Sequence, residues 1–576
     1  MHSCFLDGYM GSFRFLMEGN YKPIIVQSDG SILLEVMSEA YEDARDAILP
    51  FTELVKSPEY VHTYRITALS IWNAAATGMT FDEVMTRLGS FSRYEIPKSV
   101  ISRIKEAFSR WGSVSLSRAD KSNIIVEVRD ERILEEIVSN RKLGPIVKEI
   151  LSPRRFIIPS DERGRFKHLL IKMGYPADDM VGYEDGEPLG FHLRRNTLSG
   201  KLFELRQYQK EAVDNFWANG SPRGGQGIVV LPCGSGKTMV GIGVMEKLKT
   251  CTLILCTSVA AVRQWITELL DKTSLERDDV GEYTGPRKEI RPVTVTTYQI
   301  LTYRKSRRGP FEHMNLMKAR NWGLLIYDEV HVLPAPVFRA TIEIQAKRRL
   351  GLTATLIRED GLEEDAFSLI GPKCYDVPWK ELEEKGFIAE AICYEIRIPL
   401  PRHMKGEYVA ASDRMQFRIA SENPYKDTLV KQIVSKHRGE SILIIGQYIN
   451  QLKRLSSILK VPLITGSTSE SKRGTLYSAF RHGDIPVLVV SKVANFAIDL
   501  PDASVAIQVS GTFGSRQEEA QRLGRILRPK KRVSTFYTLV TSESPEENFA
   551  HKRQVFLAEQ GYRYMIKEFS HADLDS

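Results

Sequence analysis

Short apolar runs rich in β-branched residues recur through the second half of this 576-residue chain, and they constrain its fold more than any other feature. They occupy Gly227–Leu231, Thr252–Cys256, Pro292–Thr296, Gly323–Tyr327, Arg349–Leu352, Ser441–Ile445, Val487–Val490, Ser504–Val509 and Thr535–Val540. Between most of these runs lie longer segments with the apolar spacing of a helix. Strands that are apolar throughout are buried on both faces, so their alternation with helices predicts parallel α/β sheets.

The strands are too many for one compact sheet, and the regular alternation of strand and helix patterns is lost near Lys380–Pro401. We therefore expect two α/β lobes, at residues 201–385 and 386–576. At roughly 150 residues per domain, a chain of this length holds about four domains. The first 200 residues therefore have room for two smaller domains.

The N-terminal part has a mixed α and β pattern. Pro23–Val36 is predicted to form a hairpin around Asp29-Gly30. Thr80 and Glu83 have the spacing of a capping box at a helix start. Helices followed by β-prone runs at 113–116 and 124–128 favour a winged-helix-like domain over residues 1–144. A helical scaffold without a nucleic-acid contact fits the same pattern equally well.

Residues 145–200 are predicted to form a small separate α+β domain. Five basic residues between positions 154 and 167 make it locally positive: Arg154, Arg155, Arg163, Arg165 and Lys167. A solvated basic face explains this charge as well as a binding surface does.

The overall charge is mildly basic, because 80 Lys and Arg residues outnumber 72 Asp and Glu residues. The resulting formal charge of +8 permits a nucleic-acid partner without requiring one. No apolar run approaches the roughly 20 residues of a membrane span. The N-terminus also lacks the basic segment of a secretory signal, so we expect a cytoplasmic protein.

The segment Leu231-Pro-Cys-Gly-Ser-Gly-Lys-Thr238 follows a predicted strand and opens a predicted helix. Gly234 and Gly236 allow the backbone to wrap closely around phosphates, and the helix N-terminus favours an anion. Lys237 can reach the β- and γ-phosphates, while the hydroxyl of Thr238 is a candidate Mg²⁺ ligand. The strict phosphate-loop pattern has glycine where Leu231 stands, but the strand–loop–helix context still predicts a nucleotide site.

A second apolar strand, Leu324–Tyr327, ends in two carboxylates. Asp328 is expected to hold Mg²⁺, and Glu329 is expected to orient or deprotonate the attacking water. Such a pair is often only the start of a loop, but a phosphate loop about 90 residues upstream makes the catalytic interpretation the better one. His331, three residues beyond Asp328, is a candidate coupling residue.

A third element is the basic run Gln521–Arg528. Arg525 and Arg528 lie three positions apart and share a helical face. Arginines that arrive from another lobe can neutralise the charge that develops during phosphoryl transfer. A basic exposed helix is the alternative, although Gly524 inside the run indicates a close approach to another group.

Taken in order, these motifs resemble those of superfamily 2 helicases, and among them the XPB-like family of the bacterial type. The most specific segments are Asp328-Glu-Val-His331 and Arg358-Glu-Asp360, which follows Gly351-Leu-Thr-Ala-Thr355. The resemblance implies two RecA-like lobes with a short thumb-like insertion near 402–418. It also implies an XPB-type accessory domain at 1–144 and a small damage-recognition-like domain at 145–200. One departure is Ala497, where the family often has glycine.

The resemblance implies an ATP-dependent 3′–5′ DNA helicase or double-strand DNA translocase of nucleotide-excision repair, with ATP and Mg²⁺ as cofactors. For nucleotide binding it implies Arg206, Gln209, Gly234, Ser235, Gly236, Lys237, Thr238 and Gln521. For catalysis it implies Asp328, Glu329, Lys237, Arg525 and Arg528, with Thr238 and Asp328 on the metal. For DNA contact it implies Ser258, Arg263, Thr297, Arg358, Glu359, Asp360, Gln447 and Ser491. For coupling it implies His331, Thr353 and Thr355.

The expected partner is DNA at single- and double-strand junctions, bound without sequence preference by a nucleoid-associated monomer. A nuclease is the candidate protein partner. Three alternatives stay open. The chain could be an RNA helicase, because the two lobes are shared by both classes. It could be the motor subunit of a nuclease or restriction assembly. It could also be a nucleotide-switched binding module, although the presence of Glu329, Arg525 and Arg528 argues against a loss of turnover.

Overall fold

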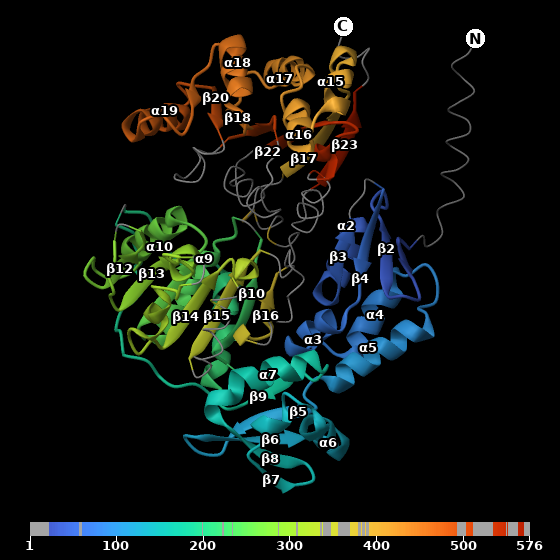
Figure 1. The fold of residues 1–576 in the computed structure, drawn as a ribbon, viewed down its shortest axis with the longest axis vertical. Helices are drawn as coiled ribbons and strands as arrows, with labels where there is room; N and C mark the ends of the chain where they lie inside the picture. The colour runs from blue at the N-terminus through green and yellow to red at the C-terminus, as the bar shows by residue number, and fades with distance from the viewer. Residues whose placement is uncertain are drawn as a thin grey trace. The chain divides into compact units, whose positions relative to one another are not determined.

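The computed structural model describes residues 22–569 with internal gaps, and the chain divides into two compact units, Met1–Trp111 and Gly112–Ser576. Figure 1 shows the described elements as ribbons. The gaps are residues 57–59, 199, 222–223, 233, 286, 307–308, 335–336, 338–346, 355–368, 378–381, 383–385, 388–390, 492–502, 511–533, 549 and 551–562. Predicted site residues outside the described residues are Thr355, Arg358, Glu359, Asp360, Gln521, Arg525 and Arg528.

The first unit contains an antiparallel sheet in the order β1-β2-β4-β3. Its strands are β1 (Ile24–Val26), β2 (Ser31–Glu35), β3 (Glu53–Lys56) and β4 (Val61–Arg65), and its helices are α2 (Tyr41–Ile48), α3 (Ala68–Ala76), α4 (Phe81–Phe91) and α5 (Lys98–Arg110). The predicted hairpin is confirmed: the N–H of Ser31 donates to Asp29 Oδ1 at 2.9 Å, and Gly30 has a φ of +87°. The capping box is also confirmed, because the Thr80 and Glu83 side chains each accept the other's backbone N–H.

The second unit begins with a five-stranded sheet in the order β7-β8-β6-β5-β9. Its strands are β5 (Val114–Arg118), β6 (Asn123–Val128), β7 (Glu149–Ser152), β8 (Arg155–Pro159) and β9 (Ala177–Asp179), and α6 (Glu131–Ser139) and α7 (Arg163–Lys172) accompany it. The expected boundary at 144/145 therefore falls inside one sheet. The strands expected to complete a winged-helix-like domain, β5 and β6, pair with each other and also with β9 and β8, so they belong to a larger sheet. The physical reason is burial, because the apolar face of β5 and β6 is covered by Phe156 and Phe166.

The first lobe is a sheet of parallel strands in the order β12-β13-β11-β14-β15-β10-β16. The strands are β10 (Gln226–Val230), β11 (Thr252–Cys256), β12 (Val280–Tyr283), β13 (Val293–Thr297), β14 (Leu324–Asp328), β15 (Arg348–Thr353) and β16 (Lys373–Asp376). Its described helices include α8 (Gln207–Trp217), α9 (Lys237–Leu248), α10 (Val259–Lys272) and α11 (Tyr298–Leu301). The predicted parallel α/β lobe is thus confirmed.

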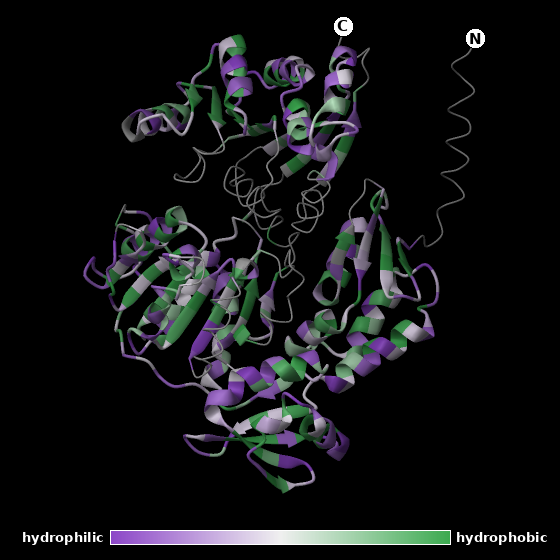
Figure 2. Cartoon of the chain, in the orientation of Figure 1, coloured by the Kyte–Doolittle hydropathy of each residue, from purple (hydrophilic) through white to green (hydrophobic). Residues whose placement is uncertain are grey.

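The second lobe repeats this plan, with parallel strands in the order β19-β20-β18-β21-β22-β17-β23. The strands are β17 (Ala391–Ile398), β18 (Ile442–Gly446), β19 (Leu463–Ile464), β20 (Val487–Ser491), β21 (Val505–Gln508), β22 (Ser534–Thr541) and β23 (Arg563–Glu568). Its helices include α15 (Lys405–Ala410), α16 (Asp413–Ser421), α17 (Tyr425–Lys436), α18 (Ile449–Leu459) and α19 (Glu470–His482). The chain passes from the first sheet to the second between β16 and β17. Figure 2 shows how strongly apolar the strands of both sheets are.

Within the described ranges, no helix combines the length and the apolar character that a membrane crossing requires.

A buried ion network joins the five-stranded sheet region to the first lobe. The Asp179 carboxylate accepts from the Arg163 guanidinium at 2.8 and 3.0 Å and from Lys167 Nζ at 2.7 Å. Lys167 also donates to Oε1 of Gln226, the first residue of β10, at 3.3 Å. Burial alone would raise the pKa of Asp179, but the charges of Arg163 and Lys167 outweigh it and hold that pKa well below its usual range.

We expect Asp179→Asn to lower the free energy of unfolding by about 3–5 kcal/mol at neutral pH, because it leaves two buried cations without their anion. Because the pKa of Asp179 is lower in the folded than in the unfolded state, its carboxylate stabilises the folded protein above about pH 4. This stabilisation is lost as the pH falls further and the carboxylate becomes protonated. The gap between wild type and variant should therefore narrow in acid, as measured by urea unfolding over a pH series. Glu204→Gln, which removes an exposed pair with Lys210, is the control and should change little. Equal effects of the two substitutions would contradict the role of the network.

Candidate nucleotide and nucleic-acid site

The predicted functional residues of the first lobe lie along one edge of its sheet. All strands of that sheet run parallel, so their carboxyl ends meet at the same edge, where α/β proteins bind ligands. From β13 to β10 the strand ends lead in turn to Thr297, Ser258, Asp328, Thr353 and Leu231. The candidate DNA contacts thus stand on one side of Asp328, and the phosphate loop stands on the other.

The phosphate loop has the geometry that the sequence predicts. Gly234 and Gly236 have φ values of +80° and +82°, which residues with a Cβ rarely adopt. Lys237 opens α9, and its Nζ lies 3.7 Å from Oε1 of Glu329 and 3.4 Å from the carbonyl oxygen of Leu231. Thr238 follows in the first turn of α9 and is half-buried. Together these groups form a cationic, donor-rich N-terminus suited to a phosphate chain.

Two residues on α8 and the residue before it support this loop. The side chains of Tyr208 and Gln209 both donate to the carbonyl oxygen of Ser235, the latter at 3.0 Å. Gln209 Oε1 also accepts from the N–H of Arg206 at 2.9 Å, so its amide is fully engaged. Gln209 is predicted to bind adenine, and here its buried amide holds the loop. Ser235 likewise shapes the loop, because its buried hydroxyl donates to the carbonyl oxygen of Pro232 at 2.7 Å.

Arg206, the other predicted adenine residue, lies beside a ring that the sequence did not indicate. Its guanidinium carbon is 4.6 Å from the ring centroid of Phe387, and Nη1 donates to the Tyr208 hydroxyl at 3.2 Å. The Tyr208 and Phe387 rings lie 5.5 Å apart. Tyr208 and Phe387 therefore add an aromatic surface next to Arg206, which a planar base can use.

Glu329 and His331 form a compact polar group at the ends of β14 and β15. Glu329 has a φ of +53°, an uncommon conformation for a residue with a side chain, and such strain is typical of functional sites. Its Oε2 is buried and accepts no hydrogen bond from the described residues. His331 Nδ1 lies 2.6 Å from the hydroxyl of Thr353 and 3.6 Å from Glu329 Oε2. The structure thus brings together three residues that the sequence predicts for catalysis and coupling.

Asp328 is held by two side chains that the sequence analysis did not single out. The indole Nε1 of Trp265 donates to Asp328 Oδ2 at 2.9 Å, and the hydroxyl of Tyr298 donates to the Asp328 carbonyl oxygen at 3.1 Å. Burial raises the pKa of the neighbouring Cys256 thiol well above its usual range, and the Asp328 charge raises it further. The thiol is therefore protonated and adds no charge to the site. No local sequence signal reveals these contacts, since Trp265 and Asp328 are 63 residues apart.

The predicted DNA contacts of the first lobe lie at two helix N-termini. Ser258 caps α10 by accepting from the N–H of Ala261 at 3.2 Å, and Thr297 caps α11 by accepting from the N–H of Ile300 at 3.2 Å. Both hydroxyls therefore have a structural role, and Thr297 is buried. Arg263, one turn into α10, is exposed.

In the second lobe, Gln447 directly follows β18 and Ser491 is the last residue of β20. The two strands are neighbours, and Gly446 pairs with Ser491. The Gln447 N–H donates to the Ser510 hydroxyl at 2.7 Å. Gln447 Oε1 and Ser491 Oγ are buried and make no hydrogen bond with the described residues. The structure thus brings the two predicted residues together, but it does not expose Ser491.

The expected insertion at 402–418 is helical and includes α15 and most of α16. Its base is fixed by Lys426, a fully buried residue of α17 whose Nζ lies 2.7 Å from Glu546 Oε2 and donates to the Val509 carbonyl oxygen at 3.1 Å. Ser421, the last residue of α16, donates to Glu546 Oε1 at 2.9 Å. The insertion is therefore tied to the lobe core and to the end of β21.

Three family models match separate parts of the chain. The family described as ERCC3/RAD25/XPB C-terminal helicase matches residues 382–573. "Helicase conserved C-terminal domain" matches residues 24–151, and "Type III restriction enzyme, res subunit" matches residues 202–358.

Curated relatives match over most of this chain. The chain is 49% identical to the DNA 3′-5′ helicase XPB of Kineococcus radiotolerans, over 96% of this chain and 97% of the relative. It is 50% identical to the protein of the same name from Mycobacterium tuberculosis, over 95% of this chain and 98% of the relative. It is 30% identical to the general transcription and DNA repair factor IIH helicase/translocase subunit XPB/SSL2 of Saccharomyces cerevisiae, over 94% of this chain and 71% of the relative.

We expect Gly236→Ala to weaken nucleotide binding about tenfold or more. The new Cβ would lie 2.7 Å from Gln209 Nε2, and the φ of +82° would cost an L-residue about 1–2 kcal/mol. Titration with a fluorescent ATP analogue measures the effect. Gly474→Ala in α19 is the control, because its Cβ meets no atom within 4 Å. Binding by Gly236→Ala as tight as by the control would contradict the proposed loop geometry.

Proposed function

We propose, because this chain belongs to the XPB family of helicases, that it is an ATP-driven 3′–5′ DNA helicase or double-strand DNA translocase of DNA repair. The observation that carries the proposal is the single edge of the first lobe, where the phosphate loop, Asp328-Glu329 and the N-termini of α10 and α11 adjoin. Nucleotide and DNA therefore contact the same rigid sheet. A change at one site can move the strand ends and helices that form the other.

For hydrolysis, Lys237 and the loop N–H groups bind the β- and γ-phosphates of ATP. The site fits Mg²⁺, because the Thr238 hydroxyl follows the loop and the Asp328 carboxylate stands at the end of β14, at the same edge of the sheet. When bound, the ion neutralises charge on the phosphate oxygens. Glu329 orients the attacking water, and its buried Oε2, which lacks a hydrogen-bond donor among the described residues, is the acceptor that this role needs.

His331 and Thr353 connect hydrolysis to movement. Their 2.6 Å contact joins the ends of β14 and β15, so a change at Glu329 reaches the neighbouring strand through His331. In the proposal, Arg525 and Arg528 approach the γ-phosphate from the second lobe, and Gln521 accompanies them. Alternating closure and release of the two lobes then advances the protein along the strand.

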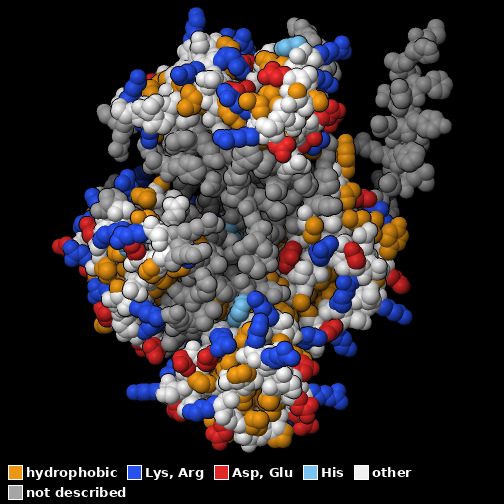
Figure 3. All heavy atoms as spheres, in the orientation of Figure 1, with side chains coloured by type: hydrophobic (Ala, Val, Ile, Leu, Met, Phe, Trp, Pro, Cys, Tyr) orange, Lys and Arg blue, Asp and Glu red, His pale blue; other side chains and the backbone are white. Residues whose placement is uncertain are grey.

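DNA is bound through its phosphates. The N-terminus of α10 provides N–H groups and a favourable dipole, and Arg263 of the same helix adds an exposed positive charge. On the face shown in Figure 3, Lys and Arg side chains are mixed with Asp and Glu, which favours local contacts over one broad basic surface. Binding is therefore sequence-independent and weakens steeply with salt. As part of the proposal, the protein works as a monomer on the nucleoid, alone or with a nuclease.

We expect ATP hydrolysis to rise several-fold with single- or double-stranded DNA and to fall by about 10² or more in Glu329→Gln, because the attacking water loses its base. Turnover is measured without nucleic acid, with each DNA form and with RNA. Greater stimulation by RNA would make the protein an RNA helicase. ATP turnover that appears only with a co-purified nuclease would indicate the motor subunit of a larger assembly. No turnover under any condition would indicate a nucleotide-switched binding module.

We expect Arg263→Ala to weaken DNA binding several-fold and to reduce the salt slope of the affinity by about 1, because one phosphate contact is lost. Fluorescence anisotropy at several salt concentrations measures both values. Arg291→Ala is the control, since Arg291 is also exposed but lies just before β13, at the amino edge of the sheet. Equal losses in the two variants would argue against α10 as a DNA contact.

A further inference from the structure

We propose that Trp265 is a positioning residue of the metal–nucleotide site, which fixes the Asp328 carboxylate through its indole N–H. This inference rests on the proposed function. Its geometric basis is the 2.9 Å hydrogen bond from Trp265 Nε1 to Asp328 Oδ2. The indole N–H can only donate, so the contact has one possible direction.

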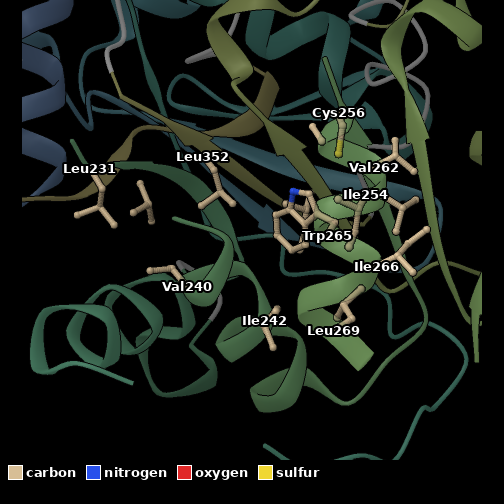
Figure 4. Packing of buried hydrophobic residues seen from close by; sticks show 14 of the residues in the cluster. Leu231, Val240, Ile242, Ile254, Cys256, Val262, Trp265, Ile266, Leu269 and Leu352 are labelled. Carbon is tan, nitrogen blue, oxygen red and sulfur yellow. The ribbon is translucent and has the colours of Figure 1, made fainter. Parts of the chain in front are cut away.

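The ring of Trp265 is held rigidly from several sides. It is 1% exposed, and Figure 4 shows it among Ile254 of β11 and Val262, Ile266 and Leu269 of its own helix. On the α9 side the packing is close, because a Cβ at Gly241 would lie 2.5 Å from the indole ring. Glycine at this position of the phosphate-loop helix thus makes room for the ring. The close packing fixes the direction of the N–H bond.

The carboxylate gains an orientation that its own backbone does not impose. The terminal torsion of an aspartate is broad, so an isolated carboxylate at a strand end can rotate. A donor on Oδ2 selects one rotation of the carboxylate. Groups that hold metal ligands in this way contribute about 10–100-fold to metal affinity in proteins. The same order of effect is expected here.

The partner of this indole sets it apart from other buried tryptophans of the chain. Trp322 donates to the carbonyl oxygen of Leu316 at 3.0 Å, and Trp72 donates to that of Ala107 at 3.2 Å. These two contacts satisfy a donor without reaching a carboxylate. Trp265 alone of the three donates to the residue proposed to hold Mg²⁺. Its helix, α10, also carries Ser258 and Arg263, so the metal site is fixed by the same element that is proposed to contact DNA.

The test compares Trp265→Phe with Trp322→Phe in the full chain. Each removes one buried indole and one hydrogen bond, so thermal unfolding reports any shared loss of stability. The decisive readout is Mn²⁺ binding in the presence of a non-hydrolysable ATP analogue, followed by electron paramagnetic resonance. Trp265→Phe should weaken Mn²⁺ binding about tenfold, while binding of the analogue in EDTA stays at the wild-type level. Trp322→Phe should leave both values unchanged.

Unchanged Mn²⁺ affinity in Trp265→Phe, or the same loss in both variants, would overturn the proposal. If Trp265→Phe does not fold, benzothienylalanine introduced at position 265 keeps the ring shape and replaces only the N–H by sulfur, and the same loss of Mn²⁺ affinity is expected. The readout does not depend on turnover. A protein that binds metal–nucleotide but never hydrolyses it would contradict the proposed function and still report on Trp265.

Discussion

Parallel hydrogen-bonded pairing of strands is the constraint on which the rest of this structure depends. Because β13, β11, β14, β15 and β10 are paired in parallel, residues far apart in sequence end at the same edge. That edge gathers the N–H groups of the glycine-rich loop, two carboxylates and two helix N-termini. The second lobe uses the same arrangement for Gln447, Ser491 and Ser510. Each loop can then differ chemically while the sheet keeps it in place.

The edge also concentrates conformations that cost free energy. Glu329 has a positive φ, and left-handed backbone costs an L-residue about 1–2 kcal/mol. The phosphate loop needs two positive-φ glycines, and Tyr208 and Gln209 hold its Ser235 carbonyl. Apolar packing beneath the edge stabilises this arrangement, with Trp265 wedged between α9 and the strands. Strain at the surface of the sheet is thus offset by close packing below it.

Buried ion pairs connect the core of the first lobe to the five-stranded sheet region, and the core of the second lobe to the inserted helices α15 and α16. Asp179 joins the five-stranded sheet region to β10 through Lys167 and Gln226. In the second lobe, Lys426 and Glu546 hold the base of the inserted helices. Such pairs are costly to break once buried, so each attached part keeps a fixed position on its own lobe. Motions of a lobe are therefore expected to carry its attached elements along.

The sequence alone predicted nine strands of the two lobes but missed β12, β16, β17, β19 and β23. It also predicted the hairpin at Asp29-Gly30, the capping box at Thr80 and the glycine-rich loop before α9. These depend on residue type and short-range spacing, which periodicity and turn chemistry report directly. The tertiary structure was needed to show which sheet β5 and β6 join and that Trp265, Tyr208 and Phe387 line the site. It also showed that Gln209 supports the loop and that Ser491 is buried. The physical reason is that these contacts depend on packing between distant segments, whose partners no local pattern specifies.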